Sequence, residues 1–339
     1  MSEKRDYQRK RLLGMLRATW VAQACSVFTI LGLPDRIAAG ANTAAELAAV
    51  ANVEPVALRR LLGALAEAGI LREAATGRYE LSPVGEYLRS DVPGSVRSTA
   101  VLYGEEVYRS FDGLLETVRT GRPSFSERFG LPFYEYLDGN PGFAATFNAA
   151  MSAAPVSRAL TADLLDGART IVDVGGGDGG LLAEALRRDP DRRGVLAELP
   201  EAAAQARERL AEAGVLDRVR IVAGSFFDEV PGGGDLYVLC HVLHNWNDAN
   251  AGRVLARVRA AMPAGARLAV LEELLPSTAQ PLTASAGAWA APRTRIVDLL
   301  MLVLMEGRDR TAEEYTKLLV DNGFAVKSIT QDAIEAVPA

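Results

Sequence analysis

The chain has 339 residues, of which 49% are hydrophobic and 24% are charged, and its formal net charge is -6. The acidic balance argues against a surface that neutralises nucleic-acid phosphates, and two cysteines are too few for a disulfide framework or a thiolate metal site. The longest apolar run near the start, WVAQACSVFTILGL, covers 14 residues, which is too short to cross a bilayer. We therefore expect a cytoplasmic globular protein of about two domains, with no metal and no nucleic-acid or membrane partner.

Apolar residues recur at intervals of three and four over residues 9–31, which predicts a helix with one apolar face. Two further helical patterns and a turn at Thr76-Gly77 between two extended pieces follow, which is the pattern of a winged helix. A winged helix can bind DNA, but its second helix offers only Arg59 and Arg60 as cations. A dimerisation or lid domain over residues 1–95 is the favoured interpretation.

Residues 96–165 are predicted to be helical and are rich in aromatic side chains, some of which could line an apolar pocket. Beyond this segment the pattern changes to alternating strands and helices, which predicts a doubly wound, Rossmann-like α/β sheet over residues 166–339. TAEEYTKLLVDNG is expected to be a helix that a capping box at Thr311 and Glu314 opens and Gly323 closes. Two final strands complete the predicted sheet.

The segment VDVGGGDGG, from Val172 to Gly180, follows the first strand of this sheet and opens a helix. Its glycines allow a tight turn and a close approach of the backbone to a ligand. Glu198 ends the next strand, where a carboxylate can accept hydrogen bonds from both hydroxyls of a ribose. This pattern alone fits NAD or S-adenosylmethionine, and a glycine-rich turn without a ligand also remains open.

The segment CHVLHNW, from Cys240 to Trp246, contains both histidines of the chain. It follows the fourth predicted strand, and ligands of a doubly wound sheet bind at the carboxyl ends of the strands. Histidine suits proton transfer because its unperturbed pKa lies near neutrality. The pattern alone leaves open a histidine that only forms a hydrogen bond at the end of a strand.

Several blocks in one order resemble the class I O-methyltransferases of bacteria and plants that act on small aromatic natural products. The blocks are LRRLLGALAEAGIL, FYEYLDGNPGFAATFNAAM, IVDVGGGDGG, ELPE, AGSFFDEVP, HVLHNWND and DLLMLVLMEGRDRT, and together they cover nearly the full length. The resemblance implies a homodimer formed through residues 1–95, a helical connector that caps the substrate over 96–165, and an S-adenosylmethionine-binding domain over 166–339. S-adenosylhomocysteine would be the product form of the cofactor.

The resemblance also implies roles for individual residues. In the family the second histidine of the block is the general base, which maps to His244, and Glu272 and Asp309 match its carboxylate partners. His241 is expected to be structural. The implied cofactor-binding residues are Asp173, Gly175, Gly177, Glu198, Leu199, Ser225, Phe226, Cys240 and Trp246, with packing the favoured role of Trp246. The implied substrate-binding residues are Phe133, Phe147, Met151, Asn245, Met301 and Met305.

Two residues depart from the pattern of the family. Ser225 stands where many relatives have Asp, and Cys240 stands where some have Lys. One alternative is therefore an enzyme of the same fold with different chemistry, such as a hydroxylation, a decarboxylation or a pericyclic rearrangement. A winged-helix regulator that senses a metabolite and an NAD-dependent oxidoreductase are further alternatives. The sequence does not identify the substrate or the methylated position.

Overall fold

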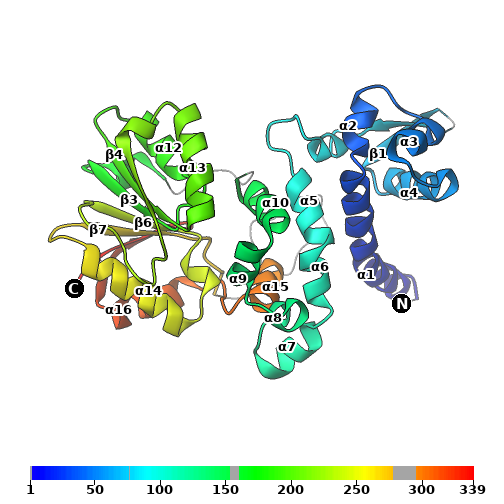
Figure 1. The fold of residues 1–339 in the computed structure, drawn as a ribbon. Coiled ribbons are helices and arrows are strands. Elements are labelled where there is room, and N and C mark those ends of the chain that lie inside the picture. The colour runs from blue at the N-terminus through cyan, green and yellow to red at the C-terminus, as the bar shows by residue number, and fades with distance from the viewer. Residues whose placement is uncertain (1, 76, 153–159, 278–294) are drawn as a thin grey trace. The chain divides into compact units, whose positions relative to one another are not determined.

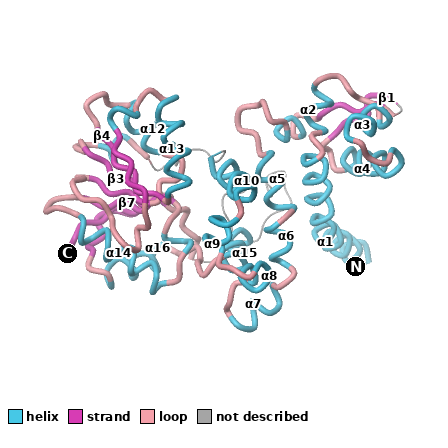
Figure 2. Tube along the Cα trace, viewed as in Figure 1, coloured by secondary structure: helices cyan, strands magenta, loops and turns pink. Residues whose placement is uncertain are grey.

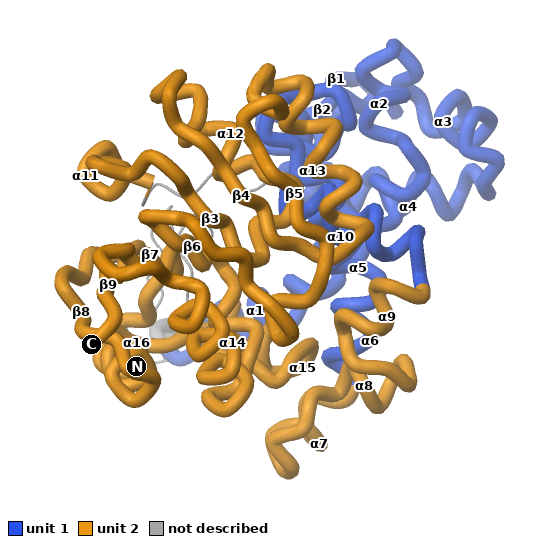
Figure 3. The backbone as a smooth tube through the Cα atoms, turned by 60° about the vertical axis from the view of Figure 1, so that its left-hand side comes forward, with its two compact units in different colours: residues 1–112, 140–154 blue, residues 113–139, 155–339 orange. Residues whose placement is uncertain are grey.

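A computed structural model of the chain describes residues 2–75, 77–152, 160–277 and 295–339. These residues form two compact units (Figure 3). The first comprises residues 1–112 and 140–154, and the second comprises residues 113–139 and 155–339. The segment that we expected to be a separate cap, 96–165, is therefore divided between the units, and the expected boundaries at 95 and 165 stay predictions.

The first unit contains the winged helix that the sequence predicts. Thr43 opens α3 with a capping box to Glu46, and Gly77 adopts a left-handed φ of 75° in the turn of the hairpin, beside residue 76, which is outside the described residues. The elements are α1 (Ser2–Ile30), α2 (Leu33–Ala38), α3 (Ala44–Ala51), α4 (Pro55–Glu67), β1 (Leu71–Ala75), β2 (Arg78–Leu81), η1 (Gly85–Leu88), α5 (Arg97–Gly104), α6 (Glu106–Phe111) and α10 (Pro141–Ser152).

Helix α1 begins earlier than the sequence pattern predicts and buries only one end of its apolar face. Phe28 is fully buried in the core of the winged helix, whereas Leu12, Leu16 and Trp20 are exposed, the last by 66%. Among the described residues, Arg5–Ile30 is the one helical segment long and apolar enough to cross a membrane, and a single segment of this kind near the N-terminus is weak evidence of a span. The absence of a membrane partner stays a prediction.

The second unit is built on a seven-stranded sheet with the order β5-β4-β3-β6-β7-β9-β8. All strands are parallel except β9, which runs antiparallel to both of its neighbours. The elements of the α/β part are β3 (Thr170–Val174), α12 (Gly180–Arg187), β4 (Arg193–Glu198), α13 (Pro200–Glu212), η2 (Leu216–Arg218), β5 (Val219–Ala223), β6 (Leu236–Cys240), η3 (Leu243–Asn245), α14 (Asp248–Ala261), β7 (Arg267–Leu271), α15 (Arg295–Leu304), α16 (Ala312–Asp321), β8 (Phe324–Ile329) and β9 (Ile334–Pro338). Four short helices precede or flank it: α7 (Leu114–Thr120), α8 (Ser124–Phe129), α9 (Phe133–Gly139) and α11 (Ala162–Leu165).

Helices cover both faces of this sheet (Figure 1). Along β6, Tyr237 and Leu239 face the core that α14 and α16 complete, whereas Leu236 and Val238 face the core that α12 and α13 complete. Because side chains alternate between the faces of a strand, continuous apolar strands such as β6 are buried on both sides. The strands of each unit belong to that unit's own sheet (Figure 2). The predicted doubly wound α/β fold is confirmed.

Candidate active site

The carboxyl ends of the parallel strands bring the predicted site residues to one edge of the sheet. Asp173, Glu198 and Cys240 lie at the ends of β3, β4 and β6, and Glu272 directly follows β7. From β3 the chain adds β4 and β5 on one side of the sheet, and from β6 it adds β7 on the other side. The strands β3 and β6 are therefore neighbours in the sheet although two strands separate them in the sequence. Such a switch point opens a crevice where ligands of doubly wound folds bind.

The glycine loop after β3 is shaped around Asp173. Gly175 and Gly177 adopt left-handed φ angles of 71° and 57°, and a Cβ atom at Gly176 would lie 2.4 Å from the carboxyl group of Asp173. The carboxylate is fully buried, and neither oxygen has a hydrogen-bond partner among the described residues. Burial, with the nearby charges of Glu198 and Asp178, raises the pKa of Asp173 to about 7.

Glu198 is tied to the same loop by its carboxylate. Its two oxygens accept hydrogen bonds from the backbone N–H groups of Gly177 and Leu199, at 2.8 and 2.7 Å. Burial nevertheless raises the pKa of Glu198. Because each carboxylate oxygen can accept more than one hydrogen bond, both oxygens keep capacity for a ligand.

Aromatic rings surround Trp246 in this unit. The ring of Tyr134 stacks on Trp246 with centroids 5.5 Å apart, and the rings of Phe226 and Phe227 meet it edge to face at 6.2 and 4.7 Å. This packing agrees with the favoured role of Trp246. Ser225 precedes the two phenylalanines, and its hydroxyl oxygen accepts the N–H of Phe227, so its second lone pair can still accept a hydrogen bond and its own proton can be donated.

Tyr134 is a residue that the sequence did not single out for the site. The amide of Asn245 forms a hydrogen bond with its hydroxyl, and the charges of Glu198 and Glu272 act on it. Burial and these carboxylates raise its pKa, so the phenol stays protonated. Only its place in the block FYEYLDGNPGFAATFNAAM could have marked it, because nothing in the local pattern separates it from core aromatics.

The Cys240 thiol is neutral at physiological pH. Burial raises its pKa well above the ordinary value, and the charges of Asp173 and Glu272 act in the same direction. A neutral thiol is a poor nucleophile and a poor metal ligand. Cys240 therefore contributes shape and polarity to this edge of the sheet.

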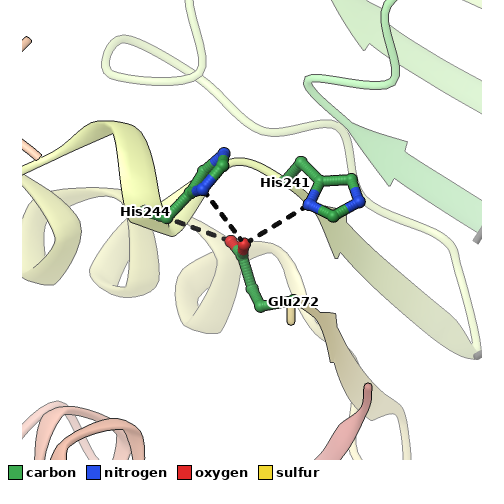
Figure 4. A group of neighbouring side chains, drawn as sticks. All are labelled: His241, His244 and Glu272. Carbon is green, nitrogen blue, oxygen red and sulfur yellow. Dashed lines mark hydrogen bonds and ion pairs between the residues drawn. The ribbon is translucent and has the colours of Figure 1, made fainter. Parts of the chain in front are cut away.

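Both predicted carboxylate partners lie against His244. Its Nδ1 atom is 3.0 Å from Oδ1 of Asp309 and 3.7 Å from Oε2 of Glu272, and its backbone N–H donates to Oε1 of Glu272 at 3.3 Å. All three side chains are buried. Figure 4 shows the other ring nitrogen of His244 directed away from Glu272. Nδ1 is thus held by carboxylates, and Nε2 is left for another partner.

His241 is also drawn to Glu272. Its Nδ1 atom lies 3.6 Å from Oε2 of Glu272, and its ring is 43% exposed (Figure 4). Its φ is 54°, and among the described non-glycine residues only Asn52 shares such a left-handed backbone. His241 is expected to pack or to form a structural hydrogen bond, and that role stays a prediction.

The segment 306–310 contacts the loop that carries both histidines, residues 241–247, which we call the histidine loop. Arg310 is fully buried and donates to the backbone carbonyls of Leu243 and Trp246, at 3.0 and 2.8 Å, and to the carboxylate of Asp248. A Cβ atom at Gly307 would lie 2.0 Å from the carbonyl oxygen of His244. Sequence reasoning missed both residues, because their partners lie more than 60 residues away.

Thr311 caps α16, as the sequence predicts, and Asp309 is not part of this cap. The Thr311 side chain accepts the N–H of Glu314, and the Glu314 side chain accepts the N–H of Thr311, which forms the predicted capping box of α16. The Asp309 backbone N–H donates to Asp298 of α15 at 2.7 Å. Asp309 is thereby anchored while its carboxylate faces His244.

The predicted substrate residues fall into two groups. Phe133, Met301 and Met305 are buried in the second unit, and Asn245 donates to the backbone carbonyl of His241 at 3.0 Å. Phe147 and Met151 belong to α10 of the first unit, where Phe147 packs near Phe143 and Met151 is 51% exposed. A role in substrate binding stays a prediction for all six residues. They are Phe133, Phe147, Met151, Asn245, Met301 and Met305.

Comparison with known families identifies the class of this protein. Residues 111–325 match the O-methyltransferase domain, and residues 13–91 match the O-methyltransferase dimerisation domain. The chain therefore belongs to the O-methyltransferase family, whose members depend on S-adenosylmethionine. The predicted family, fold, enzyme class and cofactor are confirmed.

Individual relatives act in natural-product biosynthesis. The chain is 41% identical over 321 residues to the O-demethylpuromycin-O-methyltransferase of Streptomyces alboniger, covering 93% of this chain and 83% of that protein. It is 37% identical over 314 residues to the aclacinomycin 10-hydroxylase of Streptomyces purpurascens, covering 90% and 81%.

A solved structure extends this likeness to the fold. An O-methyltransferase from neocarzinostatin biosynthesis, in complex with S-adenosylmethionine and 2-hydroxy-5-methyl naphthoic acid, matches with a TM-score of 0.81 and 32% identity, covering 94% of this chain and 96% of that one.

Proposed function

We propose that this protein methylates a phenolic or related hydroxyl of a small aromatic secondary metabolite, with S-adenosylmethionine as donor and His244 as general base. The observation that carries the proposal is the pair of buried carboxylates against Nδ1 of His244. The naphthoic acid bound to the related O-methyltransferase from neocarzinostatin biosynthesis supports an aromatic substrate. A cytoplasmic location and the absence of nucleic-acid and membrane partners stay part of the prediction.

The residues at the ends of β3 and β4 fit the cofactor. Asp173 offers two buried carboxylate oxygens without partners among the described residues, and Glu198 keeps acceptor capacity on both of its oxygens. Carboxylates suit a ligand that carries an ammonium and a sulfonium cation. A side chain at Gly175 would crowd its neighbours, because its Cβ atom would lie 3.0 Å from Val242 and 3.3 Å from Phe226. The glycine therefore keeps this space open. We assign Glu198 to the ribose hydroxyls and the Ser225 hydroxyl to the adenine amine, with Leu199, Phe226 and Cys240 beside them.

When bound, the cofactor supplies an electrophilic methyl group whose transfer to an oxygen leaves a neutral thioether. A phenol has a pKa near 10, so it is a weak nucleophile at neutral pH until a base removes its proton. With Nδ1–H donated to Asp309, Nε2 of His244 carries the lone pair that accepts the proton of the hydroxyl. Such a base contributes about 10²- to 10⁴-fold to the rate.

The two carboxylates lie beside the positive charge that forms on His244 when it accepts the proton. Asp309 and Glu272 are each only 2% exposed, so solvent weakly screens their attraction for the imidazolium. Asp309 also fixes the tautomer, because an acceptor at 3.0 Å keeps the proton on Nδ1. The two carboxylates therefore orient the imidazole of His244 and stabilise the imidazolium that proton transfer produces.

The test is methyl transfer by the purified protein to a panel of phenols, with the wild type compared with His244→Ala. We expect methylated products, and a loss of about 10²- to 10⁴-fold in kcat in the variant. Calorimetric titration with S-adenosylhomocysteine should give the same affinity for both proteins. An unchanged kcat in His244→Ala would refute the assignment of the base.

A second candidate reaction is hydroxylation in the same fold, which the likeness to the aclacinomycin 10-hydroxylase supports. This reaction would need dioxygen as the source of the oxygen atom and a two-electron reductant that takes the second oxygen atom to water. Mass spectrometry separates the two reactions, since methylation adds one carbon and two hydrogens and hydroxylation adds one oxygen. Products that gain only oxygen, with the cofactor's methyl group retained, would favour the second candidate.

We also propose that the chain acts as a homodimer through the exposed apolar face of α1. Leu12, Leu16 and Trp20 form part of this face, and the match to the dimerisation domain, over residues 13–91, includes Leu16 and Trp20. Burying such side chains stabilises association by about 1.5–3 kcal/mol each before the costs of association. Light scattering should give twice the mass of the chain, and a monomer at micromolar concentration would contradict the proposal.

A further inference from the structure

His241, His244 and Glu272 form a compact set of ligand atoms for a transition metal. One ligand atom from each residue lies within 4.8 Å of the others, and two of the separations, from the Nδ1 atoms to Oε2 of Glu272, are 3.6 and 3.7 Å. Ligand atoms around tetrahedral zinc lie about 3.3 Å apart, given metal–ligand bonds of about 2.0–2.1 Å. The first two separations need to contract by only a few tenths of an ångström. The third, between the two imidazoles, is at most 4.8 Å, so metal binding requires the exposed His241 ring to move toward His244 by up to about 1.5 Å.

The chemistry of the three ligands is also suitable. Two imidazoles and one carboxylate are the donor set of many zinc and iron(II) sites. Glu272 and Asp309 place two carboxylates in a region where both are 2% exposed. A divalent cation would neutralise this charge, and the exposed side of His241 gives the ion a path from solvent.

The backbone of His241 is a second, independent observation. A non-glycine residue in the left-handed region costs of the order of 1 kcal/mol, and such strain is concentrated at functional sites. Here the conformation occurs directly after β6, where the backbone N–H of His241 still donates to Leu271 at 3.0 Å. The ring is thereby brought to the same carboxylate as the ring of His244 (Figure 4).

We propose that His241, His244 and Glu272 bind a divalent transition metal such as Zn²⁺, and that the bound ion inhibits the enzyme reversibly. A metal on Nδ1 of His244 replaces the proton there, so the neutral ring must carry its proton on Nε2. Nε2 then donates a hydrogen bond and no longer accepts a proton. The inhibition rests on the proposed role of His244 as base, whereas metal binding does not.

The first experiment titrates ZnCl₂ into metal-free protein by calorimetry and compares the wild type with His241→Asn. Asparagine is the conservative choice because it tolerates a left-handed backbone and lacks the imidazole ligand. We expect the variant to bind zinc at least about 10- to 100-fold more weakly. Glu273→Gln is the matched control, because Glu273 is exposed and lies next to Glu272 outside the ligand set; its affinity should equal that of the wild type.

Cobalt(II) provides a spectroscopic measurement that does not depend on activity. Tetrahedral coordination by nitrogen and oxygen gives strong visible absorption, which should appear in the wild type and be absent from His241→Asn. Equal zinc affinities in these two proteins, or no zinc binding by the wild type at millimolar concentration, would overturn the site. Both measurements remain decisive even if no methyl transfer is found.

The second experiment tests inhibition. Micromolar zinc should lower the methyltransferase rate of the wild type, a chelator should restore it, and His241→Asn should keep its rate at the same zinc concentration. If zinc binds through His241 but inhibits both proteins equally, the inhibitory part of the proposal is wrong. S-adenosylhomocysteine affinity, measured with and without zinc, should stay constant.

Discussion

Nδ1 of His244 lies 3.0 Å from Oδ1 of Asp309, a residue 65 positions further along the chain. The contact joins η3, which follows β6, to the loop before α16, and both side chains are buried. Glu272 approaches the same nitrogen only to 3.7 Å, which is too far for a hydrogen bond. The two carboxylates are therefore unequal partners of the histidine.

This inequality predicts the order of two substitutions. Asp309→Asn removes a charge-assisted hydrogen bond worth about 1.5–3 kcal/mol, so kcat should fall about 10- to 100-fold. Glu272→Gln should lower kcat less, because its amide oxygen can still accept the N–H of His244. Steady-state kinetics of both variants gives the comparison, with S-adenosylhomocysteine affinity as the control. A larger loss in Glu272→Gln would contradict the assignment of Asp309 as the main partner.

Arg310 should be essential for the shape of the histidine loop. It is fully buried and donates to three backbone carbonyls and to Asp248, and a lysine cannot reach all of them from one ammonium group. Arg310→Lys should lower the free energy of unfolding by about 1–3 kcal/mol for each buried carbonyl that loses its donor, as measured by urea denaturation.

The milder variant Asp248→Asn keeps the prediction testable if Arg310→Lys does not fold. The Asp248 side chain is 59% exposed, so this change should cost at most about 1 kcal/mol and should lower kcat without altering cofactor affinity. Wild-type kcat and stability in Arg310→Lys would show that these hydrogen bonds do not hold the loop.

Gly307 should tolerate no side chain. A Cβ atom there would lie 2.0 Å from the carbonyl oxygen of His244 and 2.4 Å from the carbonyl carbon of Asn245, and both are backbone atoms. Gly307→Ala should therefore displace the histidine loop, and we expect kcat to fall at least about tenfold and stability by about 1–3 kcal/mol. Gly63→Ala in α4 is the control, because its Cβ meets nothing within 4 Å; it should stabilise the protein slightly.

Asp173 should make stability depend on pH. Its pKa is about 7 in the folded protein and has an ordinary value of 3.8, so between these values the folded state holds a proton that the unfolded state has lost. Stability therefore falls as pH rises through this window, by about 4 kcal/mol at most. Above about pH 7 the folded state bears the full cost of the buried charge.

The variant Asp173→Asn tests this dependence, since it removes the ionisable group. Relative to the wild type, it should gain stability when urea denaturation of the cofactor-free protein is moved from about pH 5 to about pH 8. Asp217→Asn, a change at an exposed position, is the control and should show no such gain. A constant difference between wild type and Asp173→Asn at both pH values would refute the raised pKa.

Local patterns in the sequence predicted most of the fold. The apolar runs predicted β3, β4, β6 and β7, the glycines predicted the loop after β3, and Thr311 with Glu314 predicted the start of α16. These features depend on residues that are a few positions apart, so they can be recognised along the chain. The sequence predicted two final strands that form a hairpin, but it did not predict that β9, and not β8, would pair with β7, because the position of a short final strand depends on its neighbours.

The residue types of the site were available from the sequence, and the family resemblance added their proposed roles. Their arrangement was decided by the tertiary structure: the distance from His244 to Asp309, the contact of Tyr134 with Trp246, the left-handed backbone of His241 and the hydrogen bonds of Arg310. The physical reason is that each of the three contacts joins segments many residues apart, and that a left-handed histidine is favoured only by the structure around it. The sequence alone thus determined which types of side chain follow the strands of the sheet. Tertiary packing determined which atoms of these side chains contact one another.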